Sequence, residues 1–304
     1  MKSDSNRHHL HAGVSIRGSL RCMEPYLWMS PALALVLFST VYPLFFALDY
    51  SLWKTQVFSK IEFVGLKNYV NLLKDKQFLG DVYNSLVFTF VGVLITTVFG
   101  FLLSVLLRHR SKANSFYRTL ILIPWVTNEI VFGLMWLWVL NPQMSPLYYW
   151  AQQIGVPLAD LLGDQNYALG TVTVLNAWRA MGFALVMTLA AFSTISKEVE
   201  EAAEVDGCSG IRKMWYIYLP MIRPVVLVMM IVLTISFFNI VGFILLMTGG
   251  GPINATEMIS IRLYKEGFRF FNMASASAIT MSMLIVNLLL SWIYKRMISS
   301  EGFH

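Results

Sequence analysis

Two groups of side chains in this chain have residue types and spacings that suit chemistry. One lies in the charged stretch EAAEVDGCSGIRKMWYIYLP at 201–220, where Glu201 offers a carboxylate to basic groups of a partner protein. The other is Asn176, Arg179 and Phe183, which share one helix face because they are spaced i, i+3 and i+7. Amides hydrogen-bond hydroxyl groups and aromatic faces stack against CH groups, so this second group suits a sugar.

The residues of the second group also have purely structural interpretations. Polar groups inside membrane-spanning helices are costly and face the interior of the helix bundle. Asn176, and Asn239 further along the chain, would then join helices by hydrogen bonds, and Arg179 would form a salt bridge. If Arg179 instead meets a substrate, that substrate is either neutral or anionic. We interpret Arg179 as the one ionisable residue within the predicted spans.

The sequence holds no motif for catalysis or nucleotide binding. No Gly-Lys pair occurs, so there is no phosphate-binding P-loop. The patterns H-E-x-x-H and G-x-S-x-G are also absent. A short tract containing His8, His9 and His11 is weak evidence for a metal site. We therefore expect no catalytic residue, and no cofactor or metal bound by this chain.

Composition and apolar runs indicate a polytopic helical membrane protein. Of 304 residues, 57% are hydrophobic and 13% are charged, whereas about 25% of the residues in a soluble domain are charged. A helix needs about 20 apolar residues to cross a bilayer. Six stretches have that length, at 27–48, 84–107, 119–140, 168–192, 225–247 and 274–294. The runs are continuous rather than alternating, which predicts an all-α fold with six transmembrane helices.

The distribution of Lys and Arg predicts that both termini lie in the cytoplasm. More of these residues flank the span ends on the side of the termini than on the other side. Residues 1–26 are polar and are expected to form a cytoplasmic tail rather than a signal peptide. The membrane domain then covers 27–296, and 297–304 form a second cytoplasmic tail. Cys22 and Cys208 fall on the same side and are expected to be free thiols.

The segment 194–224, between the fourth and fifth spans, is predicted to be a cytoplasmic hairpin of two short helices. Ser196 caps the first helix, and Gly207 ends it in the left-handed conformation. The second helix is predicted to end at Pro220, and its apolar face comprises Ile211, Met214, Trp215 and Tyr218. The first helix is rich in Asp and Glu, so anionic lipid headgroups repel it and a protein partner is favoured.

The order of residues in the hairpin resembles the signature loop of the membrane subunits of bacterial ATP-binding-cassette (ABC) importers. That signature reads E-A-A, three residues, Gly, nine residues, Ile, one residue, Leu-Pro. The chain matches it at Glu201, Ala202, Ala203, Gly207, Ile217, Leu219 and Pro220. Further features are similar to the maltose-type sugar permeases, namely Tyr42-Pro43, Gly65–Tyr69, Pro124, TGGGP at 248–252 and Gly267-Phe268. The resemblance covers about residues 27–296.

The resemblance implies a permease subunit of a sugar importer in the bacterial cytoplasmic membrane. Such a subunit pairs with a second homologous permease, two ATPase subunits that bind ATP and Mg²⁺, and a solute-binding protein; no nucleic acid takes part. Docking of the first hairpin helix on an ATPase implies coupling roles for Glu201, Ala202, Ala203, Asp206, Gly207, Leu219 and Pro220. Family analogy also implies which residues line the pathway of a sugar or sugar derivative. They are Asn176, Arg179, Phe183, Phe238 and Asn239.

A self-contained secondary transporter or channel for a small polar solute is the alternative. Such proteins commonly carry internal repeats and acidic coupling residues near the middle of the membrane. We assign no acidic residue to the predicted spans and recognise no clear repeat. The alternative also leaves the hairpin at 194–224 unexplained, so the importer is the preferred interpretation.

Overall fold

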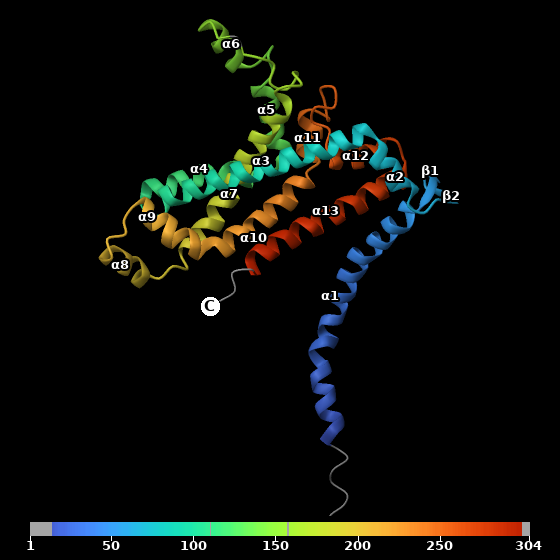
Figure 1. Ribbon diagram of the computed structural model, residues 1–304, viewed down its shortest axis with the longest axis horizontal. Coiled ribbons are helices and arrows are strands. Elements are labelled where there is room, and N and C mark those ends of the chain that lie inside the picture. Colours follow the sequence, from blue (N-terminus) through green and yellow to red (C-terminus); the bar gives the residue numbers. More distant parts are fainter. Residues whose placement is uncertain (1–13, 110, 157, 300–304) are drawn as a thin grey trace, which may run out of the picture.

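The computed structural model describes residues 14–109, 111–156 and 158–299, and these fold mostly into helices (Figure 1). Among the described residues, five helices are long and apolar enough to cross a membrane, and one bent pair brings the number to six. The helices that contain the five spans are α1 Val14–Ser51, α3 Lys76–Leu107, α7 Ala168–Phe192, α10 Leu219–Phe238 and α13 Met273–Ser299. The predicted helical, polytopic fold is confirmed. The histidines at 8, 9 and 11 lie outside the described residues.

The third span is not the continuous helix that was predicted over 119–140. It consists of α4 Lys112–Val126 and α5 Glu129–Val139, which are bent by 98° at the break between them. The break occurs because Asn128 acts as an N-cap, its side-chain oxygen accepting a hydrogen bond from the N–H of Ile130 at 2.9 Å. Asparagine competes well for such a cap and poorly for a place within a helix.

The fifth span also differs from the prediction of one helix over 225–247. Residues Met214–Phe238 form one span, which ends at Asn239, and a separate short helix, α11 Gly242–Met247, follows. A break inside a membrane needs partners for its freed backbone groups. The hydroxyl of Ser260 supplies one by donating to the carbonyl of Ile240 at 2.7 Å.

Short elements occupy the two ends of the bundle. A two-stranded antiparallel ribbon, β1 Trp53–Gln56 with β2 Ser59–Phe63, is an addition to the all-α prediction. The side chain of Asn68 ties it to the bundle by donating to the carbonyls of Ser51 and Trp53 at 2.8 and 2.9 Å. The remaining elements are α2 Lys67–Lys74, α6 Pro146–Gln153, α8 Lys197–Val205, α9 Ile211–Lys213, the π-helical turn η1 Met214–Tyr218, α12 Ile259–Tyr264 and the π-helical turn η2 Lys265–Arg269.

Small residues let the central helices approach closely. A Cβ placed on Gly100 of α3 would lie 2.4 Å from the Cβ of Ala184 of α7. One placed on Gly92 would lie 2.2 Å from the ring of Phe237, which extends from α10. Lipid provides little hydrophobic driving force between helices, so close packing of this kind is what joins spans. The contact of α3 with α7 and α10 is therefore the centre of the bundle.

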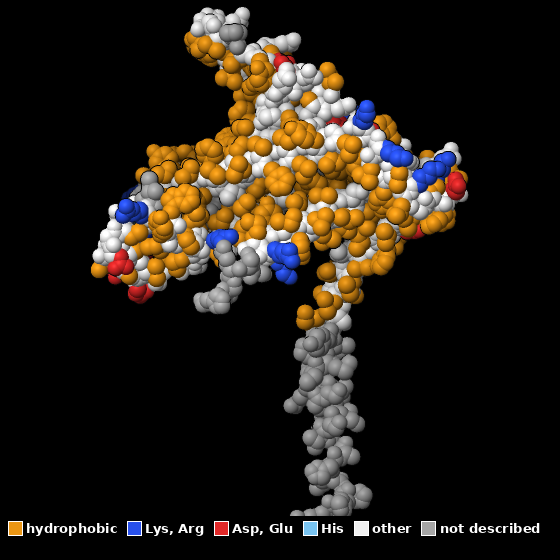
Figure 2. Space-filling view, in the orientation of Figure 1, with side chains coloured by type: hydrophobic (Ala, Val, Ile, Leu, Met, Phe, Trp, Pro, Cys, Tyr) orange, Lys and Arg blue, Asp and Glu red, His pale blue; other side chains and the backbone are white. Residues whose placement is uncertain are grey.

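Helix α1 stands apart from this bundle (Figure 1). Its end packs against α13 and β1, but its most apolar 18-residue window has no buried residue. Hydrophobic side chains cover the body of the molecule, whereas Lys, Arg, Asp and Glu gather near the ends of the helices (Figure 2). The exposed apolar surface of α1 needs lipid or another chain to cover it.

Alanine at Gly100 is expected to destabilise the chain by about 1–3 kcal/mol because its methyl group would overlap Ala184. Alanine at Gly80, on the same helix, is the matched control, because a Cβ added there would meet no neighbouring heavy atom within 4 Å. There the better helix propensity of alanine is expected to stabilise by up to about 1 kcal/mol. Thermal unfolding of the purified full chain in detergent measures both. Equal shifts in the two variants would contradict close α3–α7 packing.

Candidate functional site

The first helix of the hairpin, α8, ends in the geometry that glycine favours. Gly207 has φ of 73°, and its N–H donates to the carbonyl of Glu204 at 3.1 Å. The N–H of Cys208 donates to the carbonyl of Ala203 at 2.8 Å. These two bonds form a Schellman motif, which satisfies the carbonyl groups at the end of a helix. The predicted role of Gly207 as the turn of the hairpin is confirmed.

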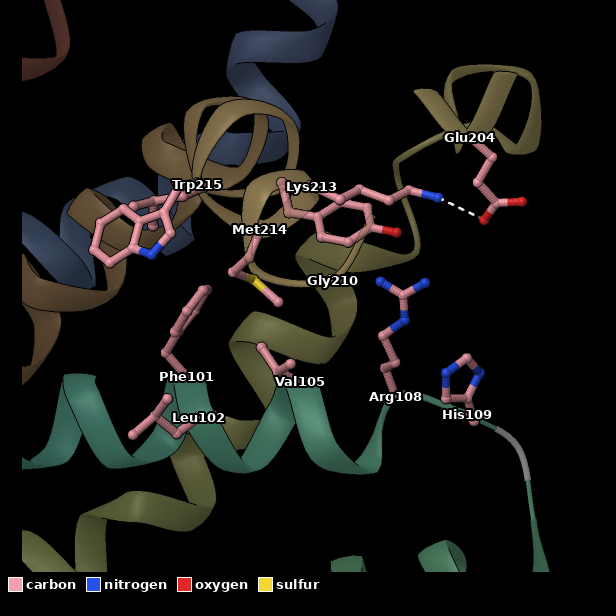
Figure 3. Close-up of a pocket in the computed structure, with 12 residues that line it drawn as sticks. Phe101, Leu102, Val105, Arg108, His109, Glu204, Gly210, Lys213, Met214 and Trp215 are labelled. Atoms are coloured by element: carbon pink, nitrogen blue, oxygen red, sulfur yellow. Dashed lines mark hydrogen bonds and ion pairs between the residues drawn. The ribbon is translucent and has the colours of Figure 1, made fainter. Parts of the chain in front are cut away.

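Polar contacts hold the hairpin against the end of α3. Arg108, at the end of α3, and the hydroxyl of Tyr218 both donate to one carboxylate oxygen of Glu200, at 3.2 and 3.0 Å. Lys213 donates to the carboxylate of Glu204 at 2.9 Å (Figure 3) and to the carbonyl of Glu200 at 2.9 Å. The bond from Lys213 holds the pKa of Glu204 below its ordinary value and raises the pKa of Lys213. The carboxylate of Glu204 is thus already paired with a cation of the same chain.

The remaining hairpin residues divide by exposure. Glu201 is exposed and has no hydrogen bond or ion pair among the described residues. Ala202, Asp206 and Gly207 are exposed as well, whereas Ala203 is 5% exposed and packs inward. The exposed carboxylate of Glu201 therefore lies beside a small side chain on α8, whose Glu198 and Glu204 are exposed as well. That surface has the chemistry to receive a basic group of another protein.

The second half of the hairpin differs from the prediction. Pro220 does not end a helix, because the chain continues from Met214 to Phe238 as one helix. The π-helical turn η1 precedes the proline, and the N–H of Leu219 bonds back to the carbonyl of Met214. Such a turn shifts the hydrogen-bond register, so a proline without an N–H is accommodated next to it. Of the predicted apolar face, Tyr218 is buried, Met214 is partly buried, Trp215 is 63% exposed, and the side chain of Ile211 lies outside those described.

The predicted pathway residues on α7 form a small polar centre within the spans. Asn176 is 1% exposed, and its side-chain oxygen accepts hydrogen bonds from Nε and Nη2 of Arg179 at 3.3 and 3.2 Å. The guanidinium also lies 3.8 Å from the carboxylate of Glu129, at the start of α5. Sequence reasoning missed Glu129, although this residue lies inside the predicted span 119–140. The interpretation of Arg179 as the ionisable residue of the spans was therefore wrong.

The other predicted pathway residues are placed differently from one another. Phe183 is partly buried, with its ring centroid 5.9 Å from that of Trp125 on α4. Phe238 is 2% exposed within a packed apolar cluster. Asn239 is exposed, and its amide exchanges hydrogen bonds with Asn287 of α13 at 3.4 and 3.3 Å. Phe238 packs within the chain, and its place on the substrate pathway stays a prediction.

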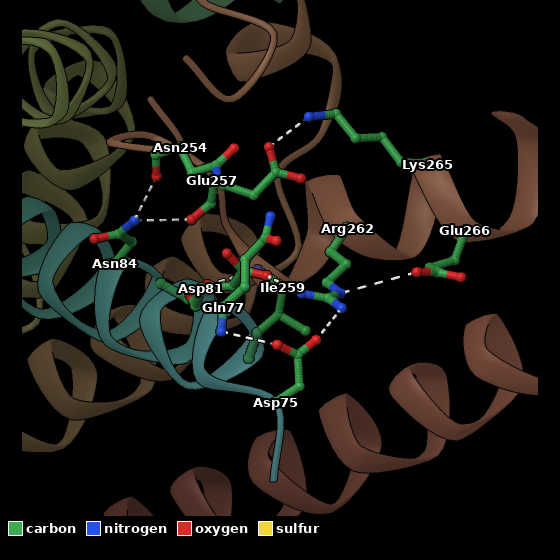
Figure 4. A network of polar contacts seen from close by, with 11 residues as sticks. Asp75, Gln77, Asp81, Asn84, Asn254, Glu257, Ile259, Arg262, Lys265 and Glu266 are labelled. Carbon is green, nitrogen blue, oxygen red and sulfur yellow. Dashed lines mark hydrogen bonds and ion pairs between the residues drawn. The ribbon is translucent and has the colours of Figure 1, made fainter. Parts of the chain in front are cut away.

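A second network of charges lies at the end of the bundle that carries α12, and sequence reasoning missed it. Arg262 of α12 bonds to Asp75 and, at 3.2 Å, to Asp81, which is 1% exposed on α3 (Figure 4). Burial by itself raises the pKa of Asp75, but its hydrogen bonds from the N–H of Gln77 and from Arg262 outweigh burial and leave that pKa lowered. This network fixes α12 against the start of α3.

The loop that contains TGGGP is held at the same place. The carboxylate of Glu257, 2% exposed, pairs with Lys265 at 2.5 Å. Asn84 of α3 donates to the carbonyls of Asn254 and Glu257 at 3.2 and 3.0 Å (Figure 4). The sequence did not reveal the bonds from Asn84, because their partners lie at least 170 residues further along the chain.

Two features now define the class of protein. The fold is a polytopic helical bundle with a polar centre in its spans, and a surface hairpin with exposed carboxylates follows the span that carries this centre. The chain belongs to the family described as "Binding-protein-dependent transport system inner membrane component", whose model matches residues 96–299. It is therefore a multi-pass inner-membrane permease subunit of an ABC importer that depends on a binding protein, and ATP hydrolysis belongs to partner subunits.

Individual relatives support this assignment. The chain is 32% identical over 256 residues to the sn-glycerol-3-phosphate transport system permease protein UgpA of Brucella abortus biovar 1 (strain 9-941), covering 84% of this chain and 87% of that one. It is 30% identical over 272 residues to the probable ABC transporter permease protein YurN of Bacillus subtilis (strain 168), covering 88% and 93%. Its fold matches, with a TM-score of 0.82 and 19% identity, a bacterial ABC transporter involved in the import of the acidic polysaccharide alginate, covering 94% and 99%.

Alanine at Asn239 or at Asn287 is expected to destabilise the chain by about 0.6 kcal/mol, the average for a hydrogen bond between spans. The double variant is expected to lose no more than Asn239→Ala alone, because both lose the same pair. Asn239→Ala also loses the bond that its amide donates to the carbonyl of Ile235 at 2.7 Å. Ser236→Ala, an exposed change on α10 with no hydrogen bond among the described residues, is the control. Thermal unfolding in detergent measures all four, and additive losses would rule out the pair.

Proposed function

We propose that this permease forms, with a second homologous permease subunit, the membrane pathway for a sugar or sugar derivative. The observation that carries the proposal is the polar centre of Asn176 and Arg179, which supplies amide and guanidinium groups within the spans. Such groups bond to hydroxyl or phosphate oxygens. Two similar proteins, an sn-glycerol-3-phosphate permease and a transporter involved in alginate import, support a carbohydrate-like substrate.

The exposed surface of α1 supports a second permease as the partner. A 24-residue apolar span with no burial in its most apolar window has more surface than the chain itself covers. Pairing with a homologous subunit would cover part of that surface and would place two polar centres around one pathway. Phe183 and the exposed Asn239 are assigned to the lining of this pathway, and the buried Phe238 to its support.

The hairpin is assigned to coupling with an ATPase subunit that binds ATP and Mg²⁺. Its support is the exposed carboxylate of Glu201 beside Ala202, held in place by the fixed end of α8 at Gly207. Asp206 lies at the same end of α8, and Leu219 and Pro220 continue from the hairpin into the span. The hairpin and both termini are then on the cytoplasmic side, as the distribution of Lys and Arg predicts. A solute-binding protein delivers the substrate from the opposite side.

Charge reversal at Glu201 is expected to uncouple ATP hydrolysis from transport without unfolding the chain. The change Glu201→Lys places a positive charge where the proposal needs a carboxylate. Like charges at an interface cost several kcal/mol. A loss of about 2 kcal/mol is enough to lower coupled uptake about thirtyfold. Uptake and ATPase activity of the reconstituted transporter measure the effect. Glu62→Lys, an exposed reversal on β2, is the control. Normal uptake by the Glu201 variant would remove its docking role.

The substrate is tested with the cognate binding protein and the intact transporter. Calorimetric titration against neutral sugars, anionic sugars and polyol phosphates is expected to identify a ligand, and uptake of that ligand is then measured. Arg179→Gln and Glu129→Gln both break the same ion pair, but only the first removes the cation. We expect Arg179→Gln to lower uptake at least about tenfold more than Glu129→Gln, as for a lost charge-assisted hydrogen bond.

Equal losses in these two variants would make Arg179 a structural residue. A binding protein that takes none of the sugars or polyol phosphates would contradict the proposed substrate class.

A further inference from the structure

A groove of about 690 Å³ lies between the end of α3 and the second half of the hairpin (Figure 3). Its apolar wall is made by Phe101, Leu102, Val105, Met214, Trp215 and Leu219. Leu102 is 49% exposed and Trp215 is 63% exposed. The described part of the chain therefore leaves this wall without a cover.

Basic side chains lie at one end of the groove. Arg108 and His109 follow α3 directly and line both this groove and an adjoining polar pocket of about 350 Å³. Arg118 of α4 lines the polar pocket as well. The apolar wall and the basic pocket are thus joined through Arg108 and His109, and Figure 3 shows both of these side chains at the end of α3.

The charges at this end do not cancel. Arg108 pairs with Glu200, and Lys213 pairs with Glu204, so both nearby carboxylates have cationic partners. Arg118 donates to the carbonyl of Leu107 and has no carboxylate partner among the described residues. The basic pocket therefore keeps an excess positive charge. Of the acidic side chains of α8, Glu204 lines the groove and Glu200 lines the polar pocket, and each is paired with a cation.

The groove also lies at the right depth to meet lipid. The span of α3 ends at Leu107 and the span Met214–Phe238 begins at the hairpin, so both reach the edge of the apolar layer here. Trp215 and Tyr216 are 63% and 78% exposed at this level. Tryptophan and tyrosine gather where the hydrocarbon layer meets the headgroups.

We propose that this groove binds an anionic phospholipid, with an acyl chain along the apolar wall and the phosphate beside Arg118 and His109. Basic pockets between spans bind anionic headgroups because each Lys or Arg near the membrane surface attracts the negatively charged lipid. A soluble anion would leave the apolar wall uncovered, and a zwitterionic lipid would bring its own cation to a positively charged site. Arg108 links the lipid to the hairpin through Glu200, so the bound lipid supports the coupling surface.

Native mass spectrometry of the intact transporter, released from nanodiscs containing equal phosphatidylglycerol and phosphatidylcholine, tests the site. The wild type is expected to retain about fivefold more phosphatidylglycerol than phosphatidylcholine, because one basic side chain near the headgroup contributes about 1 kcal/mol. Val105→Phe fills the groove and is expected to remove the retained lipid, whereas Leu106→Phe, on the 72% exposed neighbouring face, is expected to leave it. Arg118→Gln is expected to abolish the selectivity, and Arg118→Lys to restore it.

Three results would overturn the proposal. One is equal retention of the two lipids by the wild type, and another is retention unchanged by both Val105→Phe and Arg118→Gln. The third is efficient cross-linking of a cysteine at position 102 to another subunit of the intact transporter, because a protein would then occupy the groove. If Val105→Phe does not fold, the Arg118→Gln and Arg118→Lys pair decides the question alone.

Discussion

The absence of hydrogen-bond partners in a bilayer is the constraint on which this structure depends. Each span must satisfy its backbone internally, so the chain is built from long helices and interrupts them only where a side chain replaces the lost bonds. Asn128 caps the start of α5, and Ser260 donates to the free carbonyl of Ile240. The π-helical turn before Pro220 answers the same requirement by shifting the register. The irregular parts of the spans are therefore places where polar groups gather.

The same constraint applies to the charged side chains, several of which are paired within the chain. Inside the spans, the guanidinium of Arg179 lies beside the amide of Asn176 and the carboxylate of Glu129, and these groups take the place of water. At the end of the bundle that carries α12, Arg262 bridges two aspartates and fixes the start of α3. At the other end, Arg108 holds the hairpin against the end of α3, and Lys213 joins the two halves of the hairpin. A partner or a ligand therefore meets only the groups left over, chief among them Glu201 and Arg118.

One continuous element relates the polar centre to the hairpin. Helix α7 carries Asn176 and Arg179 and ends at Phe192, a few residues before α8 begins at Lys197. It packs closely against α3 at Gly100, and well-packed interiors transmit strain. A force on α8 would then reach the polar centre along α7. This geometry is suited to rigid-body transitions that couple an interface to a pathway.

The sequence by itself determined the features that are local in the chain. Apolar runs located the spans, a glycine at position 207 ended α8, and the order of residues in the hairpin pointed to the permease family. Only the tertiary structure decided the partners of the polar groups, because Glu129 and Arg179, Asn239 and Asn287, or Asp81 and Arg262 meet across helices far apart in sequence. It also decided where the spans break. At Asn239 the break is stabilised by Ser260, which donates to the carbonyl of Ile240 from 20 residues further along the chain. The cap at Asn128 is local in the chain, but the apolar run that continues on both sides of it does not reveal the break.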